Sequence, residues 1–285
     1  MPRKWWSNVR RAGKALVFLA VVGLYLPCGA WAWGNNAQRL IVNHAADTLP
    51  YELRSFFETN RNFLIQHVND PLNLVDKHPN ERQNHFIELD KYGKFPFEAL
   101  PRSYKAALSK YSKSKIESTG LLPWQIGVYS AKLTDDMRNG RWDEAKIDAA
   151  FLANYVAEAH DPFNTTENYD GRMTGQTGVN ERFNTMLIDR YGSFFPLSPH
   201  DAFFISDPTD FAFDACLNAH SLVESLLLAD RSARRGLSSY TDEYYDRFYN
   251  LAGAALIKQL SDASTDVGSY WLTAWTNAGK PPLPH

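Results

Sequence analysis

The chain has 285 residues, of which 30 are Lys or Arg and 32 are Asp or Glu, giving a net charge of −2, and 44% are hydrophobic. This composition is typical of a globular protein, and a chain of this length can bury a large core. The charge balance gives no basic surface of the kind that binds nucleic acids or anionic lipids.

The first 32 residues have the pattern of a secretory signal peptide. Five basic residues, at positions 3, 4, 10, 11 and 14, precede the apolar run "ALVFLAVVGLYLPC", and "GAWA" follows. The run is too short for a stable membrane anchor, and Ala30 and Ala32 are the small residues expected just before a cleavage site. We predict cleavage before Trp33, export to the periplasm or outside the cell, and no membrane anchor afterwards. An uncleaved anchor is the weaker alternative.

Cleavage at this position would change both the charge and the cysteine content of the chain. The mature chain keeps 25 basic and 32 acidic residues, a net charge of −7. Cys28 leaves with the signal, so Cys216 remains alone and no intrachain disulfide can form. The mature protein must therefore be stabilised by one well-filled hydrophobic core.

Helical periodicity dominates the remainder of the chain. Apolar residues recur at spacings of three and four, strand signals are sparse, and no alternating run is long enough to seed a sheet. The helices are expected at residues 36–49, 51–68, 101–111, 123–139, 143–160, 178–192, 210–230 and 241–260. Two long polar loops are expected, at residues 69–83 and 161–177. Loops of this length are typical of a surface that binds a ligand. We predict a single all-α multi-helix domain over residues 33–276, followed by a Pro-rich tail, 277–285.

One stretch, "NYVAEAHDPFNTTENYDG", combines helical spacing with unexpected residue types. Asn154 and Glu158 stand four apart and share a helix face, and Asn164 follows just past Pro162. Polar groups at such spacing often hold a metal ion. Metals prefer imidazole and carboxylate, however, and this stretch offers mainly amides.

Four pieces of sequence together resemble one known family. They are "WAWGNNAQRLI", "HFIELDKYG", "LLPWQI", and the stretch above with "TGQTGVNERFN". The chain is similar, over about residues 33–191, to the family of zinc-dependent phospholipases C and single-strand-specific zinc nucleases. The resemblance implies an all-α core around three zinc ions, bound by the N-terminal Trp and by His, Asp and Glu side chains. It also implies attack of metal-activated water on a phosphodiester.

The resemblance assigns some ligand positions that are retained and others that are substituted. The retained positions are Trp33, His85, Glu158 (where the family has Asp) and Asp70, for which Asp76 is an alternative. The substituted positions are Gln38, Asn154, Asn164, Asn180 and Asn184.

These substitutions argue against a trinuclear zinc centre, because a neutral amide is a poor zinc ligand. At most one zinc ion is expected, held by His85, Asp70 and Glu158. Amide and carboxylate oxygens would alternatively suit calcium, at lower affinity.

Each candidate also has a purely structural interpretation. On this interpretation Trp33 is a hydrophobic plug and His85 is a hydrogen-bonded core histidine. His160 lies on a different helix face from Glu158, which predicts a supporting or structural role, and His220 is expected to be packed. The remaining histidines show no ligand spacing.

Two main hypotheses follow. The first is an exported binding or structural protein with a degraded metal site, whose central cleft takes an uncharged or sugar-like small ligand. The alternative is an active metal-dependent phosphodiesterase, of phospholipase C or nuclease type, with one or two ions and a phosphodiester in that cleft. A third hypothesis, an unrelated helical envelope protein, has the least support.

Overall fold

The computed structural model describes residues 33–284. The predicted signal peptide and its cleavage site, apart from Trp33 itself, therefore lie outside the described residues. Within residues 33–284 every regular element is a helix and no strand is present, which confirms the predicted all-α fold.

Thirteen α-helices, joined by short 3-10 segments, make up the described chain. They are α1 (Asn35–Ala45), α2 (Tyr51–Thr59), α3 (Arg61–His67), α4 (Asp70–Leu74), α5 (Tyr104–Lys110), α6 (Lys113–Thr119), α7 (Leu122–Arg138), α8 (Trp142–Ala159), α9 (Val179–Glu181), α10 (Leu187–Tyr191), α11 (Pro208–His220), α12 (Val223–Arg234) and α13 (Asp242–Asn277).

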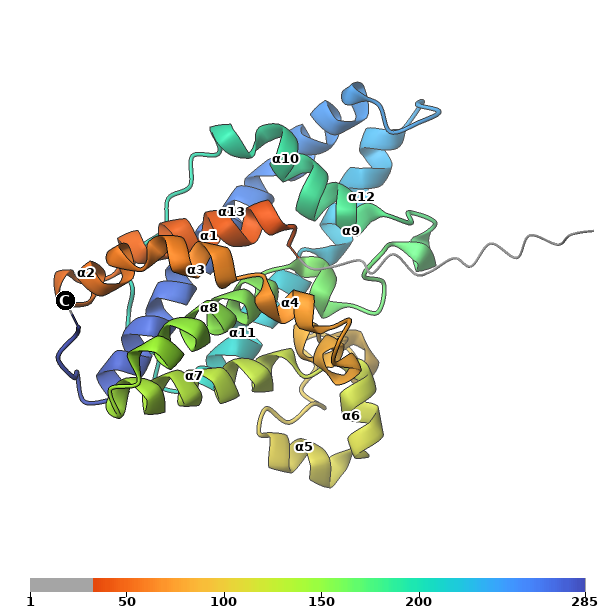
Figure 1. The fold of residues 1–285 in the computed structure, drawn as a ribbon. Helices are drawn as coiled ribbons and strands as arrows, with labels where there is room; N and C mark the ends of the chain where they lie inside the picture. Colours follow the sequence, from red (N-terminus) through yellow and green to blue (C-terminus); the bar gives the residue numbers. More distant parts are fainter. Residues whose placement is uncertain (1–32, 285) are drawn as a thin grey trace, which may run out of the picture.

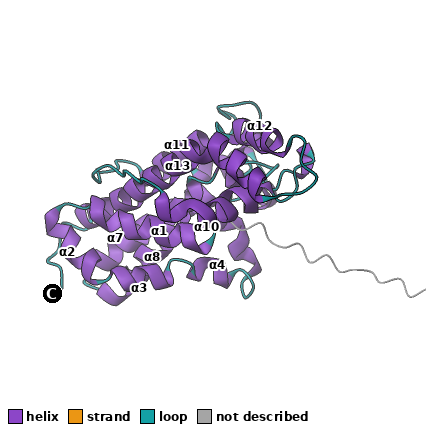
Figure 2. Ribbon diagram, turned by 90° about the horizontal axis from the view of Figure 1, so that it is seen from above, coloured by secondary structure: helices purple, strands orange, loops and turns teal. Residues whose placement is uncertain are grey.

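Helix α13, with 36 residues, is the axis of the molecule. Helices α1, α7, α8 and α12 pack against it, and α7 and α8 also pack on each other. Figure 1 shows this arrangement, with α5 and α6 set apart from the main bundle. Seen from above in Figure 2, the helices form an elongated bundle connected by loops.

Helix α8 carries polar groups into the centre of this bundle. It begins with Asp143 and Glu144, which favour a helix N-terminus. Its second half is buried on all sides, and small residues such as Ala153 and Ala157 let neighbouring helices approach closely. Asn154 and Glu158 are therefore held inside the protein rather than at its surface.

An extended segment, residues 198–205, runs along α13 and is called the strap below. Its backbone N–H groups donate hydrogen bonds to a row of hydroxyls on α13. The acceptors are Ser261 (3.2 Å, from Ser198), Thr265 (2.9 Å, from His200), Ser269 (3.1 Å, from Phe203) and Thr273 (2.8 Å, from Ile205). Ser261, Thr265 and Ser269 also donate to the carbonyl four residues earlier in α13. Three of the four hydroxyls thus bond to their own helix and to the strap at once.

Several helix boundaries differ from those expected. The prediction that α13 ends near residue 260 is wrong, since the strap satisfies the Ser and Thr residues that extend it to Asn277. The expected helix 51–68 breaks at Asn60, whose side chain donates to Phe56 O at 2.8 Å. The expected helix 210–230 divides at Ser221, which bonds to Asn218 O. The expected loop 69–83 contains α4 and a 3-10 segment.

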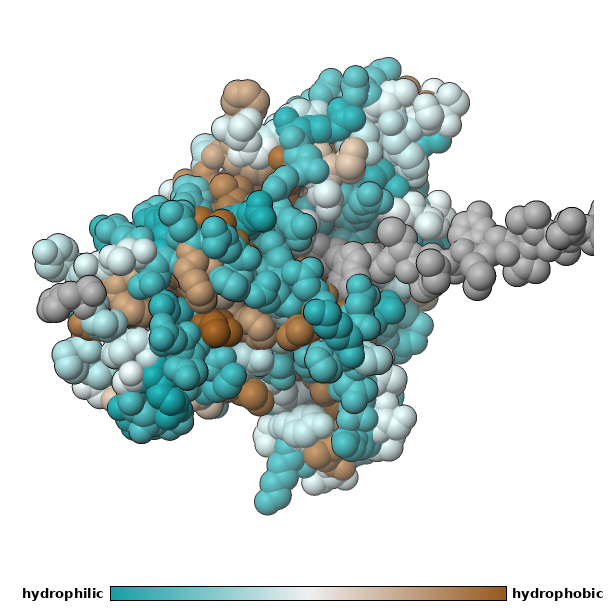
Figure 3. All heavy atoms as spheres, viewed as in Figure 1, coloured by the Kyte–Doolittle hydropathy of each residue, from teal (hydrophilic) through white to brown (hydrophobic). Residues whose placement is uncertain are grey.

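The surface has both hydrophilic and hydrophobic areas. Figure 3 shows the face seen in Figure 1 as mainly hydrophilic, with small apolar patches between the polar areas. Among the described helices, none is both long and apolar enough to cross a membrane. Cys216 is buried and free.

Candidate functional site

The five amides at the positions that the resemblance predicts to be substituted lie in the interior of the described protein, and we call them the amide cluster. They are Gln38 on α1, Asn154 on α8, Asn164 on a 3-10 turn, Asn180 on α9 and Asn184 on the π-helical segment Arg182–Met186. The most exposed of them shows 6% of its surface. The elements that carry them contact one another, so five residues separated by up to 146 positions share one region.

Direct hydrogen bonds connect parts of the cluster. The side chain of Gln38 donates to the backbone oxygen of Asn154 at 3.5 Å. The amide of Asn184 donates to the side-chain oxygen of Asn180 and, at 2.6 Å, to Asp161. Asn164 accepts a backbone hydrogen bond from Ile87 at 2.8 Å.

Two fully buried carboxylates, Glu158 and Asp161, adjoin these amides. Asp161 caps the following turn by accepting from the Phe163 N–H at 2.9 Å. Complete burial raises the pKa of Asp161 to about 7, although its hydrogen bonds from Phe163 and Asn184 act in the other direction.

His85 lies between two carboxylates. Its Nδ1 is 2.7 Å from Glu158 Oε2, and its Nε2 is 3.3 Å from Glu81 Oε1, an ion-pair distance without good hydrogen-bond alignment. Burial alone would lower the pKa of His85, but the two carboxylates raise it to about 9. Tyr155 donates to Glu81 and completes the chain of contacts.

Several buried polar atoms at this site have no hydrogen-bond partner within the described residues. They are Gln38 Oε1, Asn154 Oδ1 and Nδ2, Glu158 Oε1, Asn164 Nδ2, Asn180 Nδ2 and Asn184 Oδ1. Leaving one such buried group unpaired costs about 1–3 kcal/mol, so each of them is expected to bond to an ordered water molecule or to a bound ligand.

Trp33 packs directly beside the amide cluster. Its side chain is fully buried, and its indole N–H donates to Ala157 O at 2.7 Å. Its ring lies 6.2 Å from that of Phe183. The neighbouring Gly34 donates its N–H to Asn184 O at 3.4 Å. Trp33 therefore fills space as a plug would, and also places its backbone at the site.

The predicted acidic ligand lies elsewhere. Asp70 begins α4 with its side chain 40% exposed, and it bonds to His67 at 2.7 Å rather than to His85 or Glu158. Asp76, the alternative, is exposed. The structure thus places Trp33 beside the end of α8 that carries Glu158. Neither Asp70 nor Asp76 lies among the buried groups.

The residues present do not fit a trinuclear zinc centre. The donor set consists mainly of neutral amides, and the Nδ1 atom of its one imidazole is already bonded to Glu158. In the part of the chain that is described, no three His, Cys, Asp or Glu side chains are arranged to hold an ion.

Other histidines take structural positions. The Nε2 atom of His160 lies 2.9 Å from a carboxylate oxygen of Asp266 on α13. His220 bonds to Thr165 O at 3.0 Å and packs edge-on against Phe97.

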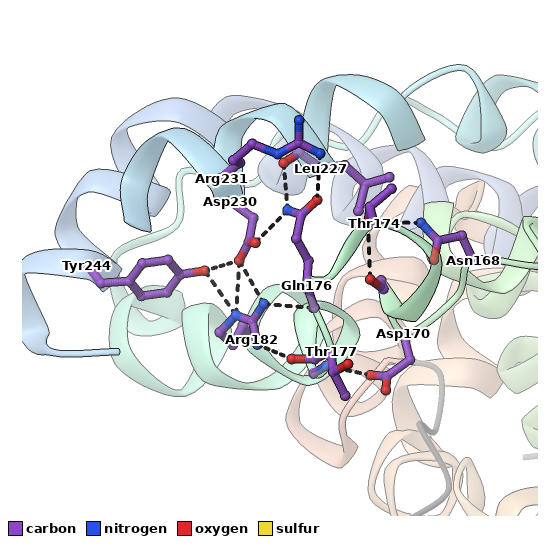
Figure 4. Close-up of polar contacts among 12 residues, drawn as sticks. Asn168, Asp170, Thr174, Gln176, Thr177, Arg182, Leu227, Asp230, Arg231 and Tyr244 are labelled. Atoms are coloured by element: carbon purple, nitrogen blue, oxygen red, sulfur yellow. Dashed lines mark hydrogen bonds and ion pairs between the residues drawn. The ribbon is translucent and has the colours of Figure 1, made fainter. Parts of the chain in front are cut away.

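A second polar network fixes α9 and the π-helical segment that follows it, which carry Asn180 and Asn184. Arg182, between them in sequence, binds Asp230 through two nitrogens at 3.0 and 2.9 Å. Tyr244 also donates to Asp230, and Gln176 does so at 2.6 Å. Figure 4 shows these side chains converging from the π-helical segment after α9, from α12, from α13 and from the loop that precedes α9.

The described residues also form an open groove, of about 790 Å³, at a different place. It lies between the first half of α7, the N-terminus of α11 and the segment before α5. Its lining includes Arg102, Tyr104, Trp124, Gln125, Asp207 and Asp210. No residue of the amide cluster lines this groove.

The fold of this chain is similar to that of solved bacterial proteins. The alpha-toxin of Clostridium perfringens from the avian strain SWCP matches with a TM-score of 0.54 and 17% identity, over 88% of this chain and 67% of the toxin. The alpha toxin of Clostridium absonum matches with a TM-score of 0.51 and 14% identity, over 87% of this chain and 67% of that chain. No protein-family model and no curated protein matches this sequence. At these identities the likeness establishes the all-α fold alone.

Sequence reasoning missed two members of the site. Glu81 and Tyr155 complete the contacts around His85, but neither stands at a ligand position of the resembling family. The spacing of Glu81 and His85, four apart, was the available signal.

Proposed function

We propose that this chain is an exported, non-hydrolytic member of the phospholipase C and zinc nuclease scaffold, which acts by binding rather than by phosphodiester cleavage. The observation that carries this proposal is the buried amide cluster. Amides of similar size replace imidazole and carboxylate at five positions, so the fold persists while zinc coordination is lost.

The ligand of such a protein would be a small, uncharged and polar molecule. Within residues 33–284, the cluster contains both amide N–H groups and oxygens that have no hydrogen-bond partner. A cation would leave those N–H groups unsatisfied, whereas hydroxyl groups of a sugar-like molecule both donate and accept. Zinc, if bound at all, is expected at no more than one ion per chain.

The test is elemental analysis of the dialysed mature protein, combined with hydrolysis assays on phosphatidylcholine and on single-stranded DNA. We expect at most one zinc ion per chain and no chelator-sensitive turnover. Two or more zinc ions, or turnover that a chelator abolishes, would instead favour the reduced-site phosphodiesterase.

A further inference from the structure

The open groove beside α7 has one wall that is mainly apolar and one that is acidic. The apolar wall comes from α7 and the start of α5, and it includes Tyr104, Trp124 and Val128. The acidic wall comes from the N-terminus of α11, with Asp207 and Asp210. The groove volume of about 790 Å³ lies within the range of about 300–1,000 Å³ that is typical of small-molecule sites. The groove can therefore hold a ligand that has both an apolar and a polar part.

A glycine on α7 lets the two walls come together. A Cβ atom at Gly127 would lie 2.1 Å from the hydroxyl oxygen of Thr209, in the first turn of α11. A larger residue at this position would therefore force Thr209 or α11 to move, whereas glycine permits the close approach. This contact brings Asp207 and Asp210, which flank Thr209, to the same groove as Trp124.

Several N–H groups around the acidic wall are already bonded within the protein. The guanidinium of Arg102 donates to Oδ1 of Asp210 and to Oδ1 of Asp214, both at 2.7 Å. The backbone N–H groups of Thr209 and Asp210 donate to Oδ1 of Asp207, both at 3.0 Å. Since these donors are engaged, a ligand at this wall has to supply donors of its own.

The acidic wall keeps both acceptors and negative charge. Within residues 33–284, no hydrogen bond reaches Oδ2 of Asp207 or Oδ2 of Asp210. Arg102 is the one cation bonded to the acids at the start of α11 in the described chain, and the helix dipole offsets only part of the remaining charge. An ionised carboxylate accepts hydrogen bonds and donates none. The wall therefore favours a ligand that carries N–H donors and positive charge.

The aromatic side chains suit the same kind of ligand. The rings of Tyr104 and Trp124 have their centroids 5.4 Å apart, and the indole N–H of Trp124 donates to Arg102 O at 2.7 Å, which fixes the ring. Val128 is 58% exposed and extends the apolar surface. Aromatic rings attract cations, and planar guanidinium groups also stack on them.

We infer that this groove is a separate ligand site, which binds an organic cation whose amidinium or guanidinium group is carried on an apolar body. The planar cation donates to the free carboxylate oxygens of Asp207 and Asp210, and the apolar body lies against Tyr104 and Trp124. No residue of the amide cluster lines the groove, so this site goes beyond the proposed function and does not depend on it.

The test titrates the mature protein, isotope-labelled at its tryptophan side chains, with three aromatic probes of similar size. Benzamidine carries both the charge and N–H donors, benzamide carries N–H donors without the charge, and phenyltrimethylammonium carries the charge without N–H donors. The NMR signal of the Trp124 indole N–H reports on the groove. The indole N–H of Trp271, which bonds to Ala149 O, is the internal control. We expect benzamidine to bind at least about fivefold more tightly than either other probe, because charge-assisted hydrogen bonds are the stronger ones.

Two substitutions test the acidic wall. Asp207→Asn keeps an oxygen that can cap α11, and Asp210→Asn leaves the second ion pair of Arg102 intact, so both variants should fold. Each should weaken benzamidine binding about threefold, as expected for the loss of one exposed carboxylate partner. Asp242→Asn is the matched control, since Asp242 is an exposed acid in the first turn of α13 and pairs with Arg190. It should leave the affinity unchanged.

Val128→Arg tests the opposite wall independently. Val128 is exposed, so the larger side chain should not disturb folding, and its guanidinium would compete with the probe for the carboxylates. Benzamidine binding should again weaken about threefold. Ile147→Arg is the control, because Ile147 is 42% exposed on α8 and does not line the groove.

The inference is overturned if benzamidine gives no saturable shift of the Trp124 signal, or shifts the Trp271 signal in its place. Binding of benzamide or of phenyltrimethylammonium as tight as that of benzamidine would also overturn it. So would equal effects of a groove substitution and its control. None of these results bears on the amide cluster, which is tested by the elemental analysis and hydrolysis assays above.

Discussion

Arg182 and Asp230 show how a buried charged pair supports the candidate site without belonging to it. Both side chains are at most 6% exposed, and Arg182 also donates to Thr177 O and Gln176 O. The guanidinium carbon lies 4.0 Å from the ring centroid of Tyr240. These contacts fix the segment on which Asn180 and Asn184 lie.

Arg182→Met should therefore destabilise the protein by about 3–5 kcal/mol, because it leaves Asp230 buried without its cation. Urea unfolding measures the loss. Arg102→Met is the control, since Arg102 pairs with Asp210 and Asp214 at the surface and should lose less than about 1 kcal/mol. Equal losses from the two variants would contradict the structural role assigned to Arg182.

Asp148 gives the protein a pH dependence that is independent of the amide cluster. Burial, and then a hydrogen bond with Asp136, raise the pKa of Asp148 from 3.8 to about 6, while Lys132 opposes the shift. A raised pKa in the folded state contributes stability that is complete below the unfolded value and is lost as pH rises through the folded value. The relevant window is thus between pH 3.8 and about 6.

Comparison with Asp148→Asn isolates this effect. The unfolding free energy of the parent, relative to the variant, should fall by at most about 3 kcal/mol between the acidic and alkaline sides of that window. Urea unfolding at several pH values measures it. For the exposed Asp143, whose pKa is lowered by Lys146, the corresponding difference should change in the opposite direction. A pH-independent difference for Asp148→Asn would show that its carboxyl keeps its ordinary pKa.

At the scale of elements, the strap and α13 depend on each other. The hydroxyls of α13 recur every four residues, so they form one row along the helix, and the extended strap meets that row. Sequence periodicity alone gives no sign of the strap, because its partners are on another element.

Thr273→Val tests this contact with little change of shape. It removes the acceptor of the Ile205 N–H, which is buried, and should cost about 1–3 kcal/mol. Thr265→Val is the matched control. Its partner His200 is exposed, so water can replace the hydroxyl and the cost should be smaller. Hydrogen exchange at Ile205 should also accelerate, and unchanged exchange would show that the strap is held by other contacts.

Element predictions succeeded where the apolar pattern was long and regular. Helices α7 and α8 lie close to their expected ranges because each has a buried stripe and a clear start. The predicted helices 51–68 and 210–230 failed at Asn60 and Ser221. There, side chains bond to nearby carbonyls and interrupt helices whose apolar pattern continues.

For the whole molecule, the position of the amides makes a reversal experiment possible. In this experiment, six substitutions are combined in one variant to restore the residue types of the resembling family. They are Gln38→His, Asn154→His, Glu158→Asp, Asn164→His, Asn180→His and Asn184→Glu. All six positions are buried, and the elements that carry them are in contact. Without metal the variant should be less stable than the parent, because ionisable groups enter the core.

Zinc should stabilise this variant by about 4 kcal/mol when free metal is a thousand times the dissociation constant. Thermal unfolding with and without zinc measures the effect, and the parent chain under the same conditions is the control. If the variant melts at one temperature in both conditions, the six positions do not form a ligand cage.

The predicted maturation is tested on intact protein recovered outside the cytoplasm. We expect its intact mass to correspond to a chain beginning at Trp33, since "GAWA" precedes that residue. Another N-terminus would contradict cleavage before Trp33.

The sequence by itself determined the all-α class, most helix positions and the residues of the amide cluster, because these depend on local periodicity and on matched motifs. It also placed Trp33, His85 and Glu158 among the candidates. Only the tertiary structure decided that Asp70 lies with His67, and that Glu81 and Tyr155 complete the surroundings of His85. It likewise revealed which buried atoms lack partners. Burial and pairing are properties of contacts between distant elements, and no local pattern encodes them.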